Sequence, residues 1–199
     1  MTPVFTASIP NAVSISTTSM NKKDYVYHPE SGEKLTPKAL ASLNKLQQNW
    51  GKKIPDVQII ISDGLNAKAL MDEGHLLPFL NLLKQNLQAQ GYMVAKENIL
   101  ITYGRVRAGY QCGEALFGNA LTSKKASGII HLIGERPGSG HHNFSAYLSA
   151  PSQATWSKKG TVDHNISRVV SGISDTALSP ALAVEETVRI FSELFEEGI

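Results

Sequence analysis

Three short apolar runs, each ending in a polar turn that contains glycine, constrain the fold of this chain more than any other feature of its sequence. The runs lie at residues 57–61, 99–103 and 129–133, and β-branched residues dominate them. Runs of this length without polar alternation are typical of strands that are buried on both faces of a sheet. They therefore predict three strands at the centre of one sheet.

Segments with helical spacing of apolar residues lie between and after these runs. Thr36 followed by Pro37 is a typical helix start, because threonine caps the helix and proline fits its first position. Ser179-Pro180 repeats this signature, and Gly91 is a typical helix end. The apolar stripes of the three predicted helices are Leu40, Leu43, Leu46 and Trp50; Leu77, Leu80, Leu83 and Leu87; and Val184, Val188, Phe191 and Phe195. Shorter helices are predicted at residues 66–70 and 114–117, and a fourth strand at residues 144–148.

Strands that alternate with helices indicate an α/β fold, with a mostly parallel sheet and helices on both of its faces. Residues 1–35 are rich in Ser, Thr, Pro and Asn and show no sustained period, so we predict a partly ordered N-terminal arm there. We expect residues 36–199 to form a single α/β domain, a length that one well-buried core supports.

Sheets of this kind bind ligands outside the carboxyl ends of their strands. The three buried runs end in Ser62-Asp63-Gly64, in Tyr103-Gly104-Arg105-Val106 and in the stretch IGERPG, which contains Glu135. The sequence therefore predicts that these three turns converge on one rim of the sheet, and that this rim is the binding site.

Charge and composition argue against several other classes of function. A formal net charge of +2 with isolated basic pairs makes no basic patch for nucleic acid or for an anionic membrane. No apolar run approaches the roughly 20 residues that span a bilayer, and the first residues lack the continuous apolar core of a signal peptide. The single cysteine, Cys112, permits no internal disulfide, which fits a reducing cytoplasm. We therefore expect neither a nucleic-acid nor a membrane partner.

Histidines and other reactive residues are present, but not in a recognised catalytic or metal-binding pattern. His141 and His142 are adjacent, so on an extended segment they point in opposite directions and do not form a metal pair. His131 lies inside a buried run, where a histidine is usually a core residue. The sequence contains no Gly-x-Ser-x-Gly elbow, no P-loop and no GxGxxG turn after a strand. We predict no metal site and assign no catalytic residue.

Glu135 has two interpretations at this level. It is either a structural acid that pairs with Arg136 and fixes the loop, or a hydrogen-bond acceptor for a ligand. Pro137-Gly138 after it sets a turn and lets a ligand approach the backbone closely. Spacing alone does not decide between the two interpretations.

Several segments, in order along the chain, resemble the small subunit of ethanolamine ammonia-lyase, an adenosylcobalamin-dependent enzyme family. They are PDVQIIISDGLNAKAL (residues 55–70), YGRV (103–106), GERPG around Glu135 with Ser145-Ala146-Tyr147 downstream, and TVDHNIS (161–167). The resemblance implies a Rossmann-like small subunit that lies beside a TIM-barrel large subunit in a hetero-oligomer, with adenosylcobalamin between the two. In that family the large subunit holds ethanolamine, and radical chemistry releases acetaldehyde and ammonia.

By position in these motifs, the resemblance assigns cofactor contacts on the corrin ring to Val106, Glu135 and Asn165. Asn165 stands where the family has a cysteine, in a stretch where His164 replaces an arginine and one position is missing. Asparagine donates and accepts hydrogen bonds, so it can serve a corrin amide. The resemblance thus favours Glu135 as a ligand acceptor, and it implies that the cofactor carries the difficult chemistry.

Two other functions stay open on the sequence alone. The departure at Asn165, together with an N-terminal region unlike that of longer family members, fits a diverged non-catalytic module that binds cobalamin or a nucleotide-like ligand. The other is a stand-alone α/β enzyme that uses Asp63, Glu135 or His142 as a general base. We expect a cytoplasmic location, with a bacterial microcompartment as the alternative.

Overall fold

The structure is a computed structural model that describes residues 1–120, 125–136 and 142–198. Its elements in chain order are α1 (Pro3–Ser8), β1 (Ala12–Ser16), α2 (Lys22–Tyr27), η1 (Pro29–Gly32), α3 (Pro37–Trp50), β2 (Val57–Ser62), α4 (Lys68–Met71), α5 (Leu76–Ala89), β3 (Val94–Thr102), α6 (Val106–Phe117), β4 (Gly128–Gly134), β5 (Phe144–Ser149), α7 (Gln153–Trp156), β6 (Arg168–Ile173) and α8 (Pro180–Glu197). Strands and helices alternate along most of the chain, which confirms the predicted α/β class.

The described strands form one six-stranded sheet in the order β1-β3-β2-β4-β5-β6. β1, β3, β2 and β4 pair in parallel, whereas β5 runs antiparallel to both of its neighbours, β4 and β6. The sheet is therefore mixed, and the mostly parallel, Rossmann-like arrangement expected from the sequence is not confirmed. The physical reason lies in residues 135–143, which connect β4 to β5. They are too few for the dozen or so residues that a parallel crossover requires.

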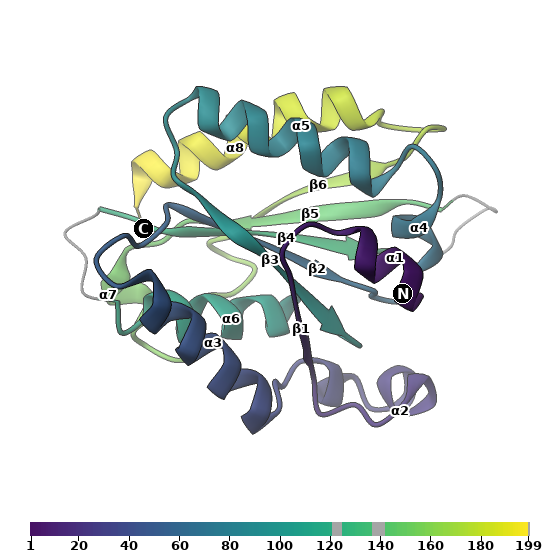
Figure 1. Cartoon of the computed structure of the whole chain (residues 1–199), viewed down its shortest axis with the longest axis horizontal. Coiled ribbons are helices and arrows are strands. Elements are labelled where there is room, and N and C mark those ends of the chain that lie inside the picture. Colours follow the sequence, from purple (N-terminus) through teal and green to yellow (C-terminus); the bar gives the residue numbers. More distant parts are fainter. Residues whose placement is uncertain (121–124, 137–141, 199) are drawn as a thin grey trace.

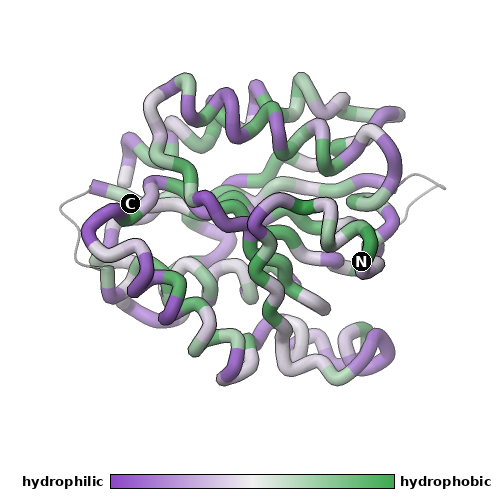
Figure 2. Tube along the Cα trace, in the orientation of Figure 1, coloured by the Kyte–Doolittle hydropathy of each residue, from purple (hydrophilic) through white to green (hydrophobic). Residues whose placement is uncertain are grey.

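Helices cover both faces of the sheet. Figure 1 shows α5 and α8 on one face and α3 and α6 on the other. Two clusters of buried apolar side chains fill the spaces between these layers. In Figure 2 hydrophobic residues concentrate along the strands, while the helices alternate between hydrophobic and hydrophilic stretches. This pattern is that of a sheet between two amphipathic helical layers.

β2, β4 and the first long helix form where the sequence predicts them, whereas β3 begins at Val94, before the predicted run, and ends at Thr102. Every residue of β2 and β4 is buried, as their continuous apolar runs indicate. The side chain of Thr36 caps α3 by accepting a hydrogen bond from the Ala39 backbone N–H at 3.1 Å. Leu43 and Leu46 of the predicted stripe are buried, whereas Leu40 is exposed at the edge of the layer.

Residues 1–35, for which the sequence predicts no strand, contribute one to the sheet. β1 lies along the outer side of β3 and pairs Ile15 with Ile101. Beyond it, α2 and η1 extend away from the two helical layers (Figure 1). Tyr25 of α2 is nevertheless buried, and its hydroxyl donates to the Gly104 carbonyl at 3.3 Å. The division into an arm and a single domain stays a prediction.

Candidate functional site

The three glycine-containing turns meet at one edge of the sheet, as predicted. β2, β3 and β4 are parallel, so their carboxyl ends point the same way. The backbone N–H of Tyr103 donates to the Asp63 carboxylate at 2.7 Å, and the backbone N–H of Leu65 donates to the Gly134 carbonyl at 3.0 Å. We call this edge, made of residues 62–66, 103–106 and 134–136, the rim.

Two glycines allow the turns of the rim to approach this closely. Gly64 has a φ of +56°, and a Cβ placed there would lie 2.2 Å from the Gly134 carbonyl oxygen. A Cβ on Gly134 would lie 2.2 Å from the Asn66 carbonyl oxygen. Any side chain at either position would push the turn after β2 away from the turn after β4.

Val106, the first predicted contact residue, begins α6 at the rim and is half-buried. The sequence predicts only the last turn of this helix, at residues 114–117. Beneath its first turns lies His131, whose Nε2 is 2.6 Å from the Ser62 hydroxyl. A Cβ on Gly109 would lie 2.2 Å from the His131 ring, so α6 rests directly on this histidine. Burial lowers the pKa of His131 to about 3, and the ring is a neutral core residue, as the sequence predicts.

Glu135, the second predicted residue, follows β4 directly and is half-buried. Its backbone N–H donates to the Asn143 carbonyl at 3.0 Å, and its side chain accepts a hydrogen bond from the Tyr147 hydroxyl at 3.0 Å. Among the described residues no ion pair joins Glu135 to Arg136. The structural interpretation of Glu135 as the partner of Arg136 is therefore not what the structure shows.

Asn165, the third predicted residue, is exposed in the loop between α7 and β6. Its backbone N–H donates to one oxygen of Asp163 at 2.8 Å, and its side-chain amide donates to the other at 3.1 Å. The next residue back, His164, lies with its ring centroid 5.9 Å from that of Tyr110. Tyr110 follows Val106 by one helical turn, so the Asn165 loop flanks the helix that Val106 begins.

Two tyrosines, Tyr147 and Tyr110, lie next to the predicted contact residues, although the sequence did not lead us to predict them as part of the site. Burial first, and the Glu135 charge second, raise the pKa of Tyr147; burial likewise raises the pKa of Tyr110. A sequence signal for Tyr147 exists, because Phe, Ala and Leu alternate with Ser, Tyr and Ser through β5. Such alternation places Tyr147 on one face of the sheet, with the two serines beside it.

The YGRV turn also carries a guanidinium group that the sequence analysis did not single out. Arg105 lies with its guanidinium carbon 4.6 Å from the centroid of the Tyr25 ring, and it donates to the Tyr25 carbonyl at 2.9 Å. These contacts tie α2 to the rim. No sequence pattern indicates this contact, because Tyr25 belongs to the N-terminal region, which shows no sustained period of apolar residues.

The candidates for a general base are engaged in other contacts. Asp63 is 7% exposed and accepts the Tyr103 hydrogen bond, and burial raises its pKa. His142 lies 2.5 Å from the Asp72 carboxylate, and His141 is outside the described residues. The described part of the chain holds no group of three or more side chains of His, Cys, Asp or Glu that could bind a metal ion.

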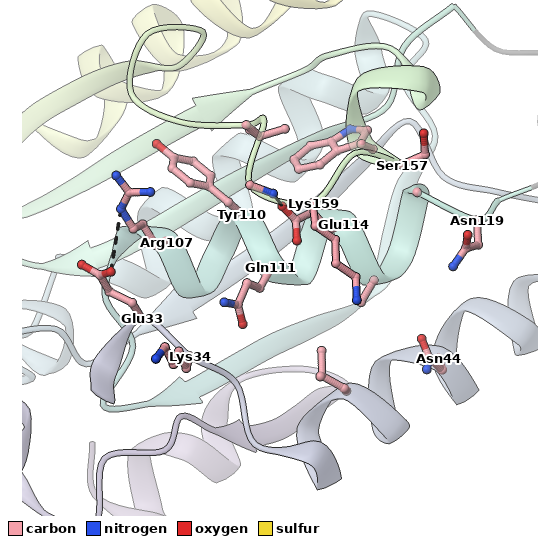
Figure 3. Close-up of a pocket in the computed structure, with 16 residues that line it drawn as sticks. Glu33, Lys34, Asn44, Arg107, Tyr110, Gln111, Glu114, Asn119, Ser157 and Lys159 are labelled. Atoms are coloured by element: carbon pink, nitrogen blue, oxygen red, sulfur yellow. Dashed lines mark hydrogen bonds and ion pairs between the residues drawn. The ribbon is translucent and has the colours of Figure 1, made fainter. Parts of the chain in front are cut away.

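A hollow of about 740 Å³ lies beside the rim, between α3, α6 and the loop that follows α7 (Figure 3). Its lining contains both acidic and basic side chains. At one end, Arg107 forms an ion pair with Glu33 at 3.8 Å. Tyr110 belongs to the lining, but Val106, Glu135 and Asn165 do not. The hollow is therefore a neighbour of the predicted contact residues and does not contain them.

The chain matches one known protein family over almost its whole length. The model of the ethanolamine ammonia-lyase light chain (EutC) matches residues 3–199. The chain belongs to this family. The resemblance carried by SDGLNA, YGRV and GERPG is thereby confirmed, and light chains of this family are named as parts of a lyase. None of the helices in the described ranges is long and apolar enough to cross a membrane.

Curated relatives carry the name ethanolamine ammonia-lyase small subunit. One from Clostridium acetobutylicum is 29% identical over 188 residues, which are 94% of this chain and 69% of the relative. One from Azotobacter vinelandii is 28% identical over 177 residues, 87% of this chain and 58% of the relative. One from Pseudomonas putida is 34% identical over 119 residues, 59% of this chain and 39% of the relative. The chain thus spans only part of the length of these small subunits.

Proposed function

We propose that the chain is a small subunit of ethanolamine ammonia-lyase and helps to hold adenosylcobalamin against a large subunit that binds ethanolamine. The observation that carries the proposal is the family match over residues 3–199. The convergence of the SDG, YGRV and GER turns on one rim supports it, because these turns carry the motifs of the resemblance. The assembled enzyme would convert ethanolamine into acetaldehyde and ammonia.

The chemistry of the rim fits a ligand rich in amide groups. Three polar atoms at or beside it are buried without a hydrogen-bond partner in the described structure: Asn66 Nδ2, Arg105 Nε and Asn143 Oδ1. Glu135 adds a carboxylate of which Tyr147 engages one oxygen. Polar atoms of this kind are costly to leave unpaired, so a ligand that brings both donors and acceptors is favoured there. The side-chain amides of a corrin ring bring both.

The proposed roles of the three contact residues follow from their positions. Glu135 accepts a hydrogen bond from a corrin amide through the carboxylate oxygen that Tyr147 leaves free. Asn165 donates one N–H of its side-chain amide to Asp163, and its side-chain oxygen would accept a hydrogen bond from a corrin amide. Val106 offers an apolar contact at the start of α6. When bound, adenosylcobalamin supplies the radical chemistry, and these residues only bind and orient the cofactor.

Partner and location follow from the same proposal. The chain works in a hetero-oligomer with the large subunit, and it binds neither nucleic acid nor a membrane. We place it in the cytoplasm, with a bacterial microcompartment as the alternative location.

One observation favours a second candidate function, a cobalamin-binding module without catalysis. Asn165 replaces the cysteine that the resemblance leads one to expect, and one N–H of its side-chain amide is held by Asp163. In a module of this kind, the contacts with cobalamin would persist while the assembled complex would not turn over.

Reconstitution tests the proposal and separates the two candidates. Ammonia release from ethanolamine is measured with the isolated chain, with the large subunit alone, and with both, each with adenosylcobalamin. We expect release only from the mixture of both subunits, because the family resemblance assigns the binding of ethanolamine to the large subunit. Turnover by the isolated chain would contradict the proposal. A mixture that binds cobalamin but releases no ammonia would favour the second candidate.

A further inference from the structure

Tyr147 lies on the sheet where the cover provided by α6 ends. His131, Tyr147 and Val169 are cross-strand partners on β4, β5 and β6, so their side chains share one face. His131 lies under α6, against Gly109, whereas Val169 is 48% exposed. Tyr147 is between them and half-buried, which places its ring at the boundary between the core and the open face of the sheet.

The hydroxyl of Tyr147 reaches Glu135 only because the ring leans along the sheet. Glu135 lies four residues beyond His131, the cross-strand partner of Tyr147, which is roughly 13 Å along a strand. Ser145 stands two residues before Tyr147 on the same face, and its small side chain leaves room for a leaning ring. Ser145 is 1% exposed even though it lies on the same face as the exposed Val169, which is what a covering ring would produce.

The hydrogen bond between the two side chains is directional. The Tyr147 hydroxyl has one proton, which it donates to the Glu135 carboxylate at 3.0 Å. Burial and the negative charge of Glu135 both raise the pKa of Tyr147, so this hydroxyl remains a donor well above neutral pH. Within the described residues no other side chain donates to Glu135. One carboxylate oxygen is thus held by Tyr147, and no side chain in the described ranges donates to the other.

We propose that Tyr147 is a positioning residue, whose hydroxyl orients the Glu135 carboxylate for a hydrogen bond from an amide N–H of bound cobalamin. This inference rests on the proposed function and assigns a role to a residue that the family resemblance does not. A carboxylate held in its binding orientation loses less conformational freedom when the ligand arrives. Removing the hydroxyl should therefore weaken binding through Glu135 alone.

The test is a double-mutant cycle on the assembled complex with the large subunit. Cyanocobalamin is titrated calorimetrically into the wild type, Tyr147→Phe, Glu135→Ala and the double variant. We expect Tyr147→Phe to weaken binding about tenfold in the wild-type background, the size of one net hydrogen bond. In the Glu135→Ala background the same change should have no further effect, because the oriented group is already gone.

Two further variants separate positioning from packing. Tyr27 is 70% exposed, so Tyr27→Phe is the matched control and should leave the affinity unchanged. Tyr147→p-aminophenylalanine keeps a donor at the end of the ring and should restore most of the affinity that Tyr147→Phe loses. Melting curves of each variant check that the fold is retained.

The outcomes are distinguishable. Equal losses from Tyr147→Phe in both backgrounds would overturn the inference, since Tyr147 would then act independently of Glu135. An unchanged affinity in Tyr147→Phe would overturn it as well while leaving the proposed function in place. A wild-type complex that binds no cobalamin would refute the proposed function and this inference with it.

Discussion

Gly64→Ala is the change that tests most sharply how the rim is built. The substitution adds one methyl group at a φ of +56°, where it would lie 2.2 Å from the Gly134 carbonyl oxygen and 2.7 Å from the Ile133 side chain. The backbone conformation alone costs alanine about 1–2 kcal/mol. Crowding adds about 1–3 kcal/mol, and strain on the Leu65–Gly134 hydrogen bond adds about 0.5–1.5 kcal/mol. We therefore expect the free energy of unfolding to fall by roughly 2.5–6.5 kcal/mol.

Gly91→Ala is the matched control for this experiment. Gly91 also has a positive φ, +89°, but a Cβ there would meet nothing within 4 Å. Only the conformational cost applies, so we expect a loss of about 1–2 kcal/mol. Urea unfolding followed by circular dichroism measures both variants against the wild type. Equal losses in the two variants would show that the close approach of the two turns contributes nothing, and would refute the account of the rim.

Three other changes have defined outcomes. Glu135→Gln keeps the shape of the side chain but loses its charge. Because a hydrogen bond to a charged group contributes about 1.5–3 kcal/mol, cobalamin should bind the assembled complex roughly ten- to a hundredfold more weakly. Unchanged affinity in a titration would remove Glu135 from the site. Burial lowers the pKa of His131 from 6.5 to about 3, so the stability that the neutral ring contributes is complete above pH 6.5 and is lost as the pH falls from there toward 3. Urea midpoints at pH 7 and pH 5 should therefore differ less in His131→Gln than in the wild type, and an equal difference would contradict the assignment. Chelation should leave the melting temperature unchanged, because the described residues contain no cluster of potential metal ligands; a large drop would point to a metal site that we have missed.

The buried core of the fold is predictable from the sequence because its signals are local. β2 and β4 are continuous apolar runs, and α3 and α8 begin at Thr36-Pro37 and Ser179-Pro180, although of Thr36 and Ser179 only Thr36 forms a side-chain cap hydrogen bond. The convergence of their turns then follows from the parallel direction of the strands. What makes these parts predictable is that each is specified by neighbours in the chain.

The parts that the sequence does not predict depend on partners far away in the chain. β1 is an edge strand with only Ile15 buried, so it has no apolar run. Most of α6 was missed, because Gly109 and Gly113 weaken a helix when judged by propensity. Both glycines are explained only by the structure, since a Cβ would lie 2.2 Å from the His131 ring and 2.3 Å from the Trp156 ring, respectively. The bond from Tyr147 to Glu135 likewise requires the antiparallel pairing of β5 with β4, whereas the sequence analysis expected a mostly parallel sheet.

Co-sedimentation of the chain with the large subunit of ethanolamine ammonia-lyase, with and without adenosylcobalamin, tests the central claim most directly. Absorbance of the cofactor and of the protein are followed together in the same run. We expect one faster species that contains both chains and carries the cofactor absorbance, and we expect Glu135→Gln to reduce the bound cofactor without dissociating the chains. If the two chains sediment separately, and the cofactor moves with neither this chain nor a complex, the claim that this chain is a cobalamin-holding small subunit is contradicted.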